Sequence, residues 1–417
     1  MPVAVTWMQT ADTWTSEPFP AHRMTAYSDR ICGPDETWSR IEALLPRFGI
    51  TRLSRLTDLD RVGIPVWNAV SPNARSIVIN QGKGITDIDA RVSAAMEGLE
   101  RAIAGDPLVP ARRSSRRTFA ETEETCLPLD IFVAAGQAFI DEYEEIDWLA
   151  GHNIVTGDRV FVPREAVCLD RTNLTPRFWQ SSDGLASGNS ESEAILHGLL
   201  ERIERDADRL WRLLPRAKRL ACAIDPTAID DPVVADLVGR IRDAGLDLKL
   251  FDITRDLAVP TYAAVLGSEG LAEKQQPLFH DATIGYGTHP VAIRAIIRAL
   301  TEVAQSRLTY ISGARDDLFA ETFTRPLAPE TLALFGAEPG PAKAYPSPQG
   351  DATTLLAHCL EKLAQAGITP VIAVPLGDTT LPISVVKVVV PGLENPEGAR
   401  RHTVGSRALS TMLFGST

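Results

Sequence analysis

Long apolar runs are missing from this 417-residue sequence, and none approaches the roughly 18 residues that a membrane-spanning helix needs. A basic segment followed by an apolar one is missing after Met1, so we expect no signal peptide, no membrane partner and a cytoplasmic location. Positive charge is in deficit, since 42 Lys and Arg face 54 Asp and Glu, for a net charge of -12. Nucleic-acid-binding proteins present a basic face, so we expect no nucleic-acid partner.

Cysteine is scarce and scattered, with five residues and no CxxC spacing. An odd number of isolated thiols argues against a disulfide framework or a zinc site and fits a reducing compartment. We expect these thiols to be small buried side chains without a catalytic role. They are Cys32, Cys126, Cys168, Cys222 and Cys359.

The common nucleotide and hydrolase motifs are also missing. Gly82-Lys83-Gly84 lacks the frame of a phosphate-binding P-loop, and no GxGxxG, GxSxG or HExxH motif occurs. Hydrophobic residues make up 44% of the chain and charged residues 23%, which is typical of a globular protein with a large core. Any nucleotide site must therefore be built in another way.

The order of apolar patterns and turn signals predicts a mixed α/β protein in two parts. Residues 1–75 would form an N-terminal segment packed on the core, and residues 76–417 the main domain. We expect a helix over 37–48 that begins after Asp35 and a strand over 76–80. The remaining expectations are turns at 82–84 and 285–287, a solvated loop at 105–127, a hairpin at 153–165, a strand–helix–strand unit at 219–265, long loops at 267–287 and 327–350, and strands within 371–390.

Three stretches carry acidic residues at helical spacing. At about 100° per residue, each helix would have an apolar face and a separate acidic face. We call the six acidic residues the acidic cluster: Glu97 and Glu100 in the first stretch, Glu193, Glu201 and Glu204 in the second, and Glu302 in the third.

These acidic faces have two explanations. Each could be an ordinary solvent-facing surface of an amphipathic helix. Surface helices, however, usually pair Glu with Lys four residues away, and Glu193, Glu201 and Glu204 share a stripe without Lys. Clustered carboxylates without a side-chain cation suit Mg²⁺, which binds one or two carboxylates together with phosphate oxygens. A helix start after Asn189 would add backbone N–H groups that favour anions.

With their flanks, these stretches resemble the YcaO domain family over roughly residues 30–410. The motifs occur in the order that the family has them. They are Leu56 to Val66 with Gly82-Lys83-Gly84, Ser93 to Arg101, Ser187 to Ala207, Gly287-Thr-His-Pro290, Arg298 to Thr309 with Gly313 to Asp317, and Val389 to Glu394.

The resemblance implies a YcaO-type ATP-binding fold, with amphipathic acidic helices packed on sheets, and makes residues 76–417 an ATP-binding catalytic domain. It implies that ATP and Mg²⁺ are the cofactors and that a peptide backbone amide is activated by phosphorylation of its oxygen. If a Cys, Ser or Thr side chain of the substrate attacks, the product is an azoline. If sulfide attacks, the product is a thioamide.

The resemblance also implies roles for single residues. The whole acidic cluster would bind Mg²⁺, and Glu201, Glu204 and Arg298 would act in catalysis. Ala186 stands where the family often has Ser, so a contact there would pass to Ser187 or be lost. The nucleotide or its phosphates would contact Lys83, Ser93, Ser187, Asn189, Arg298 and Gln305.

The last residues distinguish branches of the family. Azoline-forming members typically end in a Pro-rich tail, whereas this chain ends Leu413-Phe-Gly-Ser-Thr417. We therefore favour the thioamide-forming branch that works with a TfuA partner. An azoline-forming cyclodehydratase is the alternative, and a non-catalytic nucleotide-binding accessory protein is the second. The expected partners are a precursor peptide or protein substrate and a TfuA-like or separate leader-binding protein, and a homodimer is left open.

Overall fold

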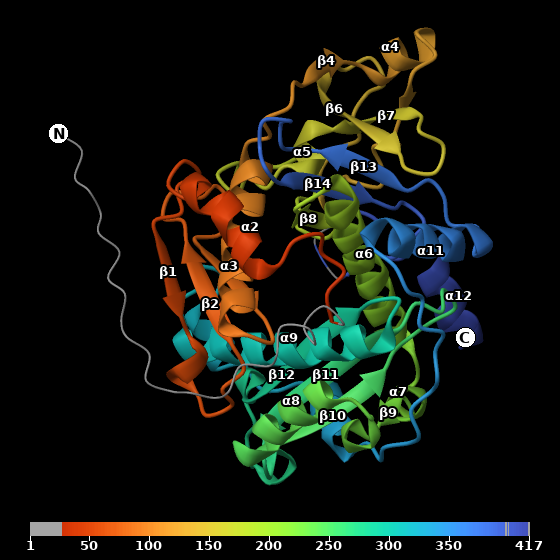
Figure 1. The fold of residues 1–417 in the computed structure, drawn as a ribbon. Helices are drawn as coiled ribbons and strands as arrows, with labels where there is room; N and C mark the ends of the chain where they lie inside the picture. The colour runs from red at the N-terminus through yellow and green to blue at the C-terminus, as the bar shows by residue number, and fades with distance from the viewer. Residues whose placement is uncertain (1–26, 397, 399, 416–417) are drawn as a thin grey trace, which may run out of the picture.

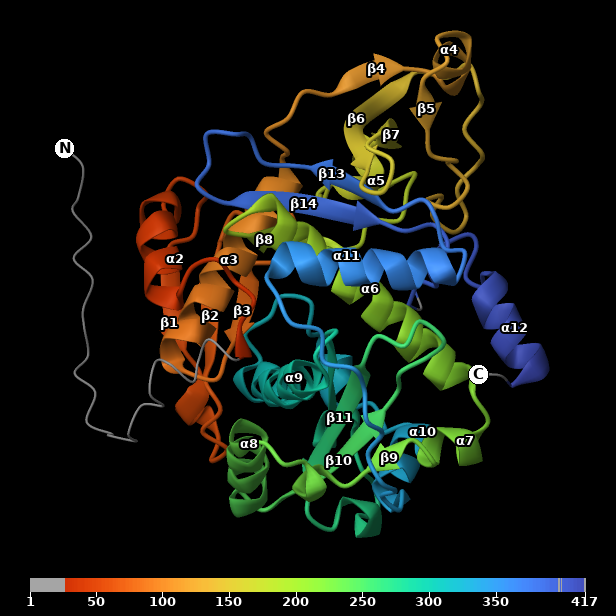
Figure 2. The ribbon, with the colours of Figure 1, turned by 45° about the vertical axis from the view of Figure 1, so that its right-hand side comes forward.

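The computed structural model describes residues 27–396, 398 and 400–415, and within these residues the strands form three sheets. The predicted mixed α/β class is confirmed. Residues 1–26 of the expected N-terminal segment lie outside the described residues. Figures 1 and 2 show helices α3, α6 and α9 meeting in the middle of the molecule, between the largest sheet and a smaller sheet.

The first sheet has the order β1-β2-β3 and is antiparallel throughout. Helix α3 packs on β2 and β3, and α2 packs on α3. The boundary that we predict at residue 75 falls between β2 and β3, which pair with each other, and the division stays a prediction. The elements are α2 (Pro34–Ile41), β1 (Arg52–Arg55), β2 (Val66–Val70), β3 (Ile79–Lys83) and α3 (Asp87–Gly105).

The largest sheet joins two distant parts of the chain in the order β5-β7-β6-β13-β14-β8, with β4 also paired to β6. Helix α6 lies on β8 and β14, and α11 packs against α6. The elements are β4 (Arg112–Ser114), α4 (Arg116–Glu121), β5 (Thr125–Cys126), β6 (Ile146–Asn153), β7 (Arg159–Pro163), α5 (Arg164–Val167), β8 (Leu185–Gly188), α6 (Glu191–Leu213), α11 (Ala352–Gln365), β13 (Ile372–Pro375) and β14 (Ser384–Val389).

The third sheet is antiparallel in the order β12-β11-β10-β9. Helix α9 packs on β12 and β11, and α8 packs on β10. Its elements are β9 (Ala223–Ile224), α8 (Pro232–Asp243), β10 (Leu246–Asp252), β11 (Thr261–Ser268), β12 (Ala282–Thr288) and α9 (Ala292–Ser312). The remaining helices are α7 (Arg216–Leu220), α10 (Pro329–Leu332) and α12 (Ser406–Phe414), and the 3₁₀ turns are Glu42–Leu44, Thr57–Leu59, Pro226–Ala228, Leu271–Glu273, Phe279–Asp281, Ala320–Phe323 and Ala333–Gly336.

Each of the three central helices buries its apolar face in a hydrophobic core, as their spacing predicts. Leu99 of α3, Leu199 of α6 and Leu300 of α9 are all fully buried. Local sequence sets where two of these helices begin. Thr86 and Asp89 form a capping box at α3, and the Ser190 hydroxyl accepts the backbone N–H of Glu193 at α6.

The turns expected at the two glycine motifs are wrong, because Gly82 lies in β3 and Gly287 lies in β12. A Cβ on Gly82 would come 2.0 Å from the backbone nitrogen of Ala94 in α3. A Cβ on Gly287 would come 2.0 Å from the backbone oxygen of Ala295 in α9. These glycines therefore let a helix backbone lie directly against a strand, which a sequence pattern cannot distinguish from a turn.

Other boundaries also differ from expectation. Helix α2 begins at Pro34, after Gly33, and the strand expected at 76–80 is β3, three residues later. The stretch at 105–127 contains β4, α4 and β5 rather than only a loop, and 267–287 contains most of β12. The hairpin at 153–165, the strand–helix–strand unit and the strands within 371–390 are confirmed. Across the described ranges, no helix has the length and apolar character to cross a bilayer.

Candidate active site

The acidic cluster comes together where α3, α6 and α9 meet. Ser187, just before α6, donates to Glu100 of α3, and the carboxylates also influence one another's pKa values. The pKa of Glu100 is raised by burial and by Glu97 of its own helix and Glu201 of α6. The pKa of Glu204 is raised by burial and by Glu302 of α9. The three stretches are therefore parts of one site.

Three carboxylates of the acidic cluster share one arrangement. One oxygen accepts a backbone N–H from a neighbouring strand or loop, and the other contacts a side-chain cation. The N–H group fixes the direction of the carboxylate, while the cation neutralises it. Glu97 accepts the backbone N–H of Gln81 at 3.1 Å and contacts Arg101 at 2.9 Å. Glu201 accepts the backbone N–H of Gly184 at 2.8 Å and contacts Arg205 at 3.2 Å. Glu302 accepts the backbone N–H of Tyr286 at 3.1 Å and contacts Lys83.

Two other carboxylates lack a full counter-charge. Glu100 accepts a hydrogen bond of 3.0 Å from the Ser187 hydroxyl, and burial together with the nearby carboxylates raises its pKa to about 8. Glu204 lies 3.4 Å from Arg205, which it shares with Glu201. Burial and the Glu302 carboxylate raise the pKa of Glu204 above its ordinary value. A further cation at this point would relieve both groups.

Glu193 differs from the rest of the cluster because N–H groups already surround it. Its side chain is fully buried, and it accepts the backbone N–H of Asn189 at 2.9 Å and that of Ile31. The Asn189 amide and the Arg30 guanidinium contact it at 3.3 and 3.9 Å. The predicted ligand role of Glu193 stays a prediction, and its contacts suit a residue that anchors the start of α6.

The predicted nucleotide-binding residues fall into two groups. Lys83 and Ser187 contact the acidic cluster directly. Asn189 lies just before α6, and its buried side-chain oxygen has no hydrogen-bond partner among the residues that the structure describes. Gln305 instead donates to the backbone oxygen of Gln81 at 2.7 Å, which ties α9 to β3. Ser93 is half-buried on α3, and its hydroxyl makes no hydrogen bond to any described residue.

Arg298 of α9 lies near the acidic cluster. Its backbone oxygen accepts the Thr301 hydroxyl at 3.1 Å, but its guanidinium makes no hydrogen bond to any described residue. Burial, followed by Arg30 and Arg298, lowers the pKa of His197 on α6 well below its ordinary value. The Arg298 charge also acts on Glu204, whose pKa it lowers against the effect of burial. The guanidinium therefore faces the space between α6 and α9.

The α6 stripe has no Lys, but a cation of another kind contacts it, because Arg205 pairs with both Glu201 and Glu204. A search for Lys alone overlooks this Arg, which stands four residues after Glu201 and next to Glu204 in the sequence. The contacts of Asp183 with Arg205 and with Arg400 had no sequence signal, because these residues are brought together only by folding.

The fit to Mg²⁺ can be judged from these groups. Within the described ranges, no three His, Cys, Asp or Glu side chains stand together in a metal-binding arrangement. The carboxylates of Glu97, Glu201 and Glu302 are held by side-chain cations instead. Oxygen donors with an unmet charge, at Glu100 and Glu204, are the chemistry that Mg²⁺ with a polyphosphate would satisfy. The donor set therefore fits Mg²⁺ bound to a nucleotide.

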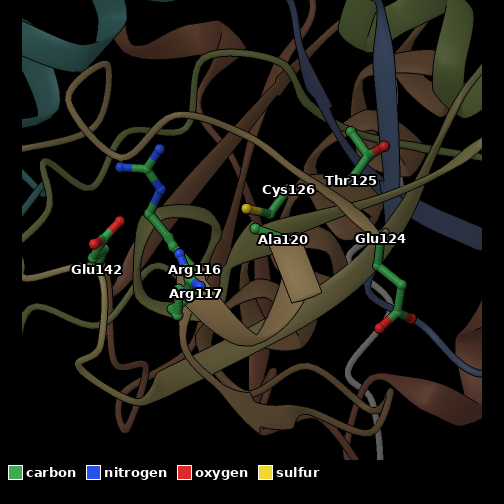
Figure 3. Close-up of a pocket in the computed structure, with 7 residues that line it drawn as sticks. All are labelled: Arg116, Arg117, Ala120, Glu124, Thr125, Cys126 and Glu142. Carbon is green, nitrogen blue, oxygen red and sulfur yellow. The ribbon is translucent and has the colours of Figure 1, made fainter. Parts of the chain in front are cut away.

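A cavity lies elsewhere, beside α4 and β5 (Figure 3). Its volume is about 290 Å³, and no residue of the acidic cluster lines it. Arg117 there pairs with Glu121 of its own helix.

The five cysteines are free thiols whose pKa values are all raised, chiefly by burial, in line with their expected lack of reactivity.

The chain matches the family model described as YcaO cyclodehydratase, ATP- and Mg²⁺-binding, over residues 81–394. A curated relative from Rhizobium leguminosarum bv. trifolii, named an uncharacterized protein in the tfuA 3′ region, is 37% identical, and the match covers 93% of each chain. An uncharacterized protein of Methanothermobacter thermautotrophicus is 34% identical, with 87% of this chain and 94% of that protein covered.

Solved structures share the fold. The YcaO protein of Methanopyrus kandleri bound with AMPPCP and Mg²⁺ gives a TM-score of 0.68 at 26% identity, covering 88% of this chain and 92% of that one. A heterocyclase in complex with substrate and cofactor gives a TM-score of 0.72 at 22% identity, covering 88% of this chain and 54% of that longer chain. The chain therefore belongs to the YcaO family, whose cofactors are ATP and Mg²⁺.

Proposed function

We propose that this protein is an ATP-dependent enzyme that converts a peptide backbone amide into a thioamide, with sulfide as donor and a TfuA-like protein as partner. The observation that carries the ATP-dependent step is the acidic cluster, in which Glu100 and Glu204 lack a full counter-charge. The choice of product is supported by the curated relative from a tfuA 3′ region.

The side chains have distinct proposed roles. Glu97, Glu201 and Glu302 are already oriented by backbone N–H groups, so each can offer its second oxygen to Mg²⁺ once its side-chain cation moves. Glu100 accepts only the Ser187 hydroxyl and has no such cation to displace, whereas Glu204 shares Arg205 with Glu201. Glu193 stays in the proposed ligand set, with its contacts favouring an anchoring role. When bound, Mg-ATP supplies the phosphoryl group that turns the amide oxygen into a leaving group.

The displaced cations have a second use. Lys83 pairs with Glu302 in the structure and would turn to a phosphate when a nucleotide enters. The Arg298 guanidinium makes no hydrogen bond within the described residues, so it would be available to neutralise charge that develops at the transferred group. The unpartnered Asn189 oxygen and the adjacent N-terminus of α6 complete the polar wall of the site.

The thioamide reaction follows from this site with all atoms balanced. Sulfide forms a bond to the amide carbon, and the carbon–oxygen bond breaks as oxygen leaves with the phosphoryl group as phosphate. The proton of the sulfur leaves to solvent, and the substrate side chains are unchanged. Azoline formation would use the same site, but a substrate Cys, Ser or Thr would replace sulfide.

The deciding experiment is mass spectrometry of a candidate precursor peptide after incubation with the enzyme, ATP, Mg²⁺, sulfide and a TfuA-like protein. We expect replacement of one oxygen by sulfur, dependent on both ATP and sulfide. Loss of one water without sulfide would instead show the cyclodehydratase that the family description names. ATP binding without any peptide change, across a panel of precursor peptides, would favour the accessory role.

A further inference from the structure

We propose that Asp183 is a positioning residue that draws Arg205 away from the Mg²⁺-binding carboxylates of α6. Arg400 opposes this effect by competing for the same Asp183 carboxylate. Together the two residues set how strongly Arg205 competes with Mg²⁺ in the acidic cluster. The inference rests on the proposed Mg-ATP site and adds to it a control of metal affinity.

The contacts place Arg205 between three carboxylates. Its Nε atom lies 3.4 Å from an oxygen of Asp183, in the segment that leads into β8. Its two terminal nitrogens lie 3.2 Å from Glu201 and 3.4 Å from Glu204. The Nε atom of Arg205 thus contacts Asp183, and its terminal nitrogens contact the acidic cluster. The position of Arg205 depends on which side attracts it more strongly.

Asp183 remains an anion in spite of its surroundings. Its side chain is only 14% exposed, and burial alone would raise its pKa. Arg202 and Arg205, followed by the Ser181 hydroxyl and Lys387, hold the pKa of Asp183 below its ordinary value. A permanent negative charge next to Arg205 takes up part of its positive charge, which leaves Glu201 and Glu204 with less neutralisation.

Arg400 acts on Asp183 from the C-terminal part of the chain. Its guanidinium donates to the second oxygen of Asp183 at 3.3 Å and to the backbone oxygen of Pro396 at 2.9 Å. Because Asp183 divides its charge between two guanidinium groups, loss of Arg400 would strengthen its hold on Arg205. Loss of a positive charge near the acidic cluster would act in the same direction, toward tighter Mg²⁺ binding.

The two residues therefore predict effects of opposite sign. Asp183→Asn releases Arg205 to Glu201 and Glu204, so Mg²⁺ should bind about fivefold more weakly. Arg400→Gln should make Mg²⁺ bind about threefold more tightly. A merely structural role would weaken binding in both variants. Isothermal titration of Mg²⁺ into the full chain with a saturating non-hydrolysable ATP analogue measures this without any turnover.

Two matched variants serve as controls. Arg401→Gln removes the neighbouring exposed Arg, which contacts the Gln137 backbone oxygen and the Phe139 ring. Asp106→Asn removes an exposed carboxylate that pairs with Arg164. Neither contacts Asp183, so both should bind Mg²⁺ as the wild type does. Melting temperatures of all variants confirm that each protein is folded.

The outcomes separate this inference from the proposed function. Opposite shifts in the two variants support it, whereas shifts of the same sign, or no difference from the controls, overturn it. If one variant does not fold, the sign of the shift in the other decides in the same way. Failure of the wild type to bind Mg²⁺ with the analogue would overturn the proposed site itself, and this inference with it.

Discussion

Lys83 of β3 and Glu302 of α9 form an ion pair across 219 residues of sequence. Burial acts to raise the pKa of Glu302, but Lys83 and Arg205 hold that pKa below its ordinary value. The pair therefore joins the first sheet to the third through the proposed site. We infer that Lys83 exchanges this partner for a phosphate when a nucleotide binds.

Lys83→Gln should weaken binding of a non-hydrolysable ATP analogue by about tenfold or more, because a charge-assisted contact to phosphate is lost. Isothermal titration with saturating Mg²⁺ measures the change. Lys249→Gln, which alters a cation paired with Asp247 on β10, is the control and should bind normally. An unchanged affinity in Lys83→Gln would remove this residue from the nucleotide site.

The double variant Glu201→Gln with Glu204→Gln should lose detectable Mg-ATP binding and remain folded. The substitutions keep the side-chain shape, and relief of repulsion at Glu204 offsets the charge pairing with Arg205 that is lost, so the melting temperature without Mg²⁺ should change little. Binding is measured by titration and folding by circular dichroism. Glu191→Gln, at an exposed position in the first turn of α6, is the control. Normal Mg-ATP binding by the double variant would show that the metal site lies elsewhere.

Glu100 predicts how stability depends on pH. Its pKa is raised from 4.5 to about 8 in the folded protein, so the folded state favours the protonated form. Ionisation therefore costs stability: the free energy of unfolding without Mg²⁺ should fall as pH rises from about 4.5 to about 8. Urea unfolding across this range measures the decline.

Two comparisons test the cause of this decline. Mg²⁺ with the ATP analogue should reduce it, because a bound cation stabilises the ionised carboxylate. Glu100→Gln should show a smaller decline than the wild type, whereas Glu191→Gln should match the wild type. An identical pH profile for Glu100→Gln would show that another group causes the change.

Gly287→Ala tests the close contact between β12 and α9. The added Cβ would lie 2.0 Å from the backbone oxygen of Ala295, which cannot move without displacing α9. The free energy of unfolding should fall by at least about 2 kcal/mol, measured by urea denaturation. Gly239→Ala, in α8 with open space around its Cβ, should instead gain about 0.5–1 kcal/mol. Equal stability of the two variants would contradict the packing.

The mismatch at the glycines shows what sequence patterns leave undecided. Gly82 and Gly287 suggested turns because glycine is the residue that turns most often require. Their actual role is to make room for helix backbones that approach from other parts of the chain. Local sequence holds no information on that approach, since it depends on how the sheet and helix pack in three dimensions.

The periodicity of the sequence was enough to predict which helices carry the acidic cluster and which face of each helix it occupies. An apolar face must be buried, so the 3.6-residue period places Glu97, Glu201 and Glu302 on the opposite side. The order of the motifs also pointed to the family that the comparisons confirm. The tertiary structure alone decided which groups meet these carboxylates. The N–H donors of Gln81, Gly184 and Tyr286 and the Lys83 cation come from strands and loops outside the three helices, and such contacts form only when distant segments pack together.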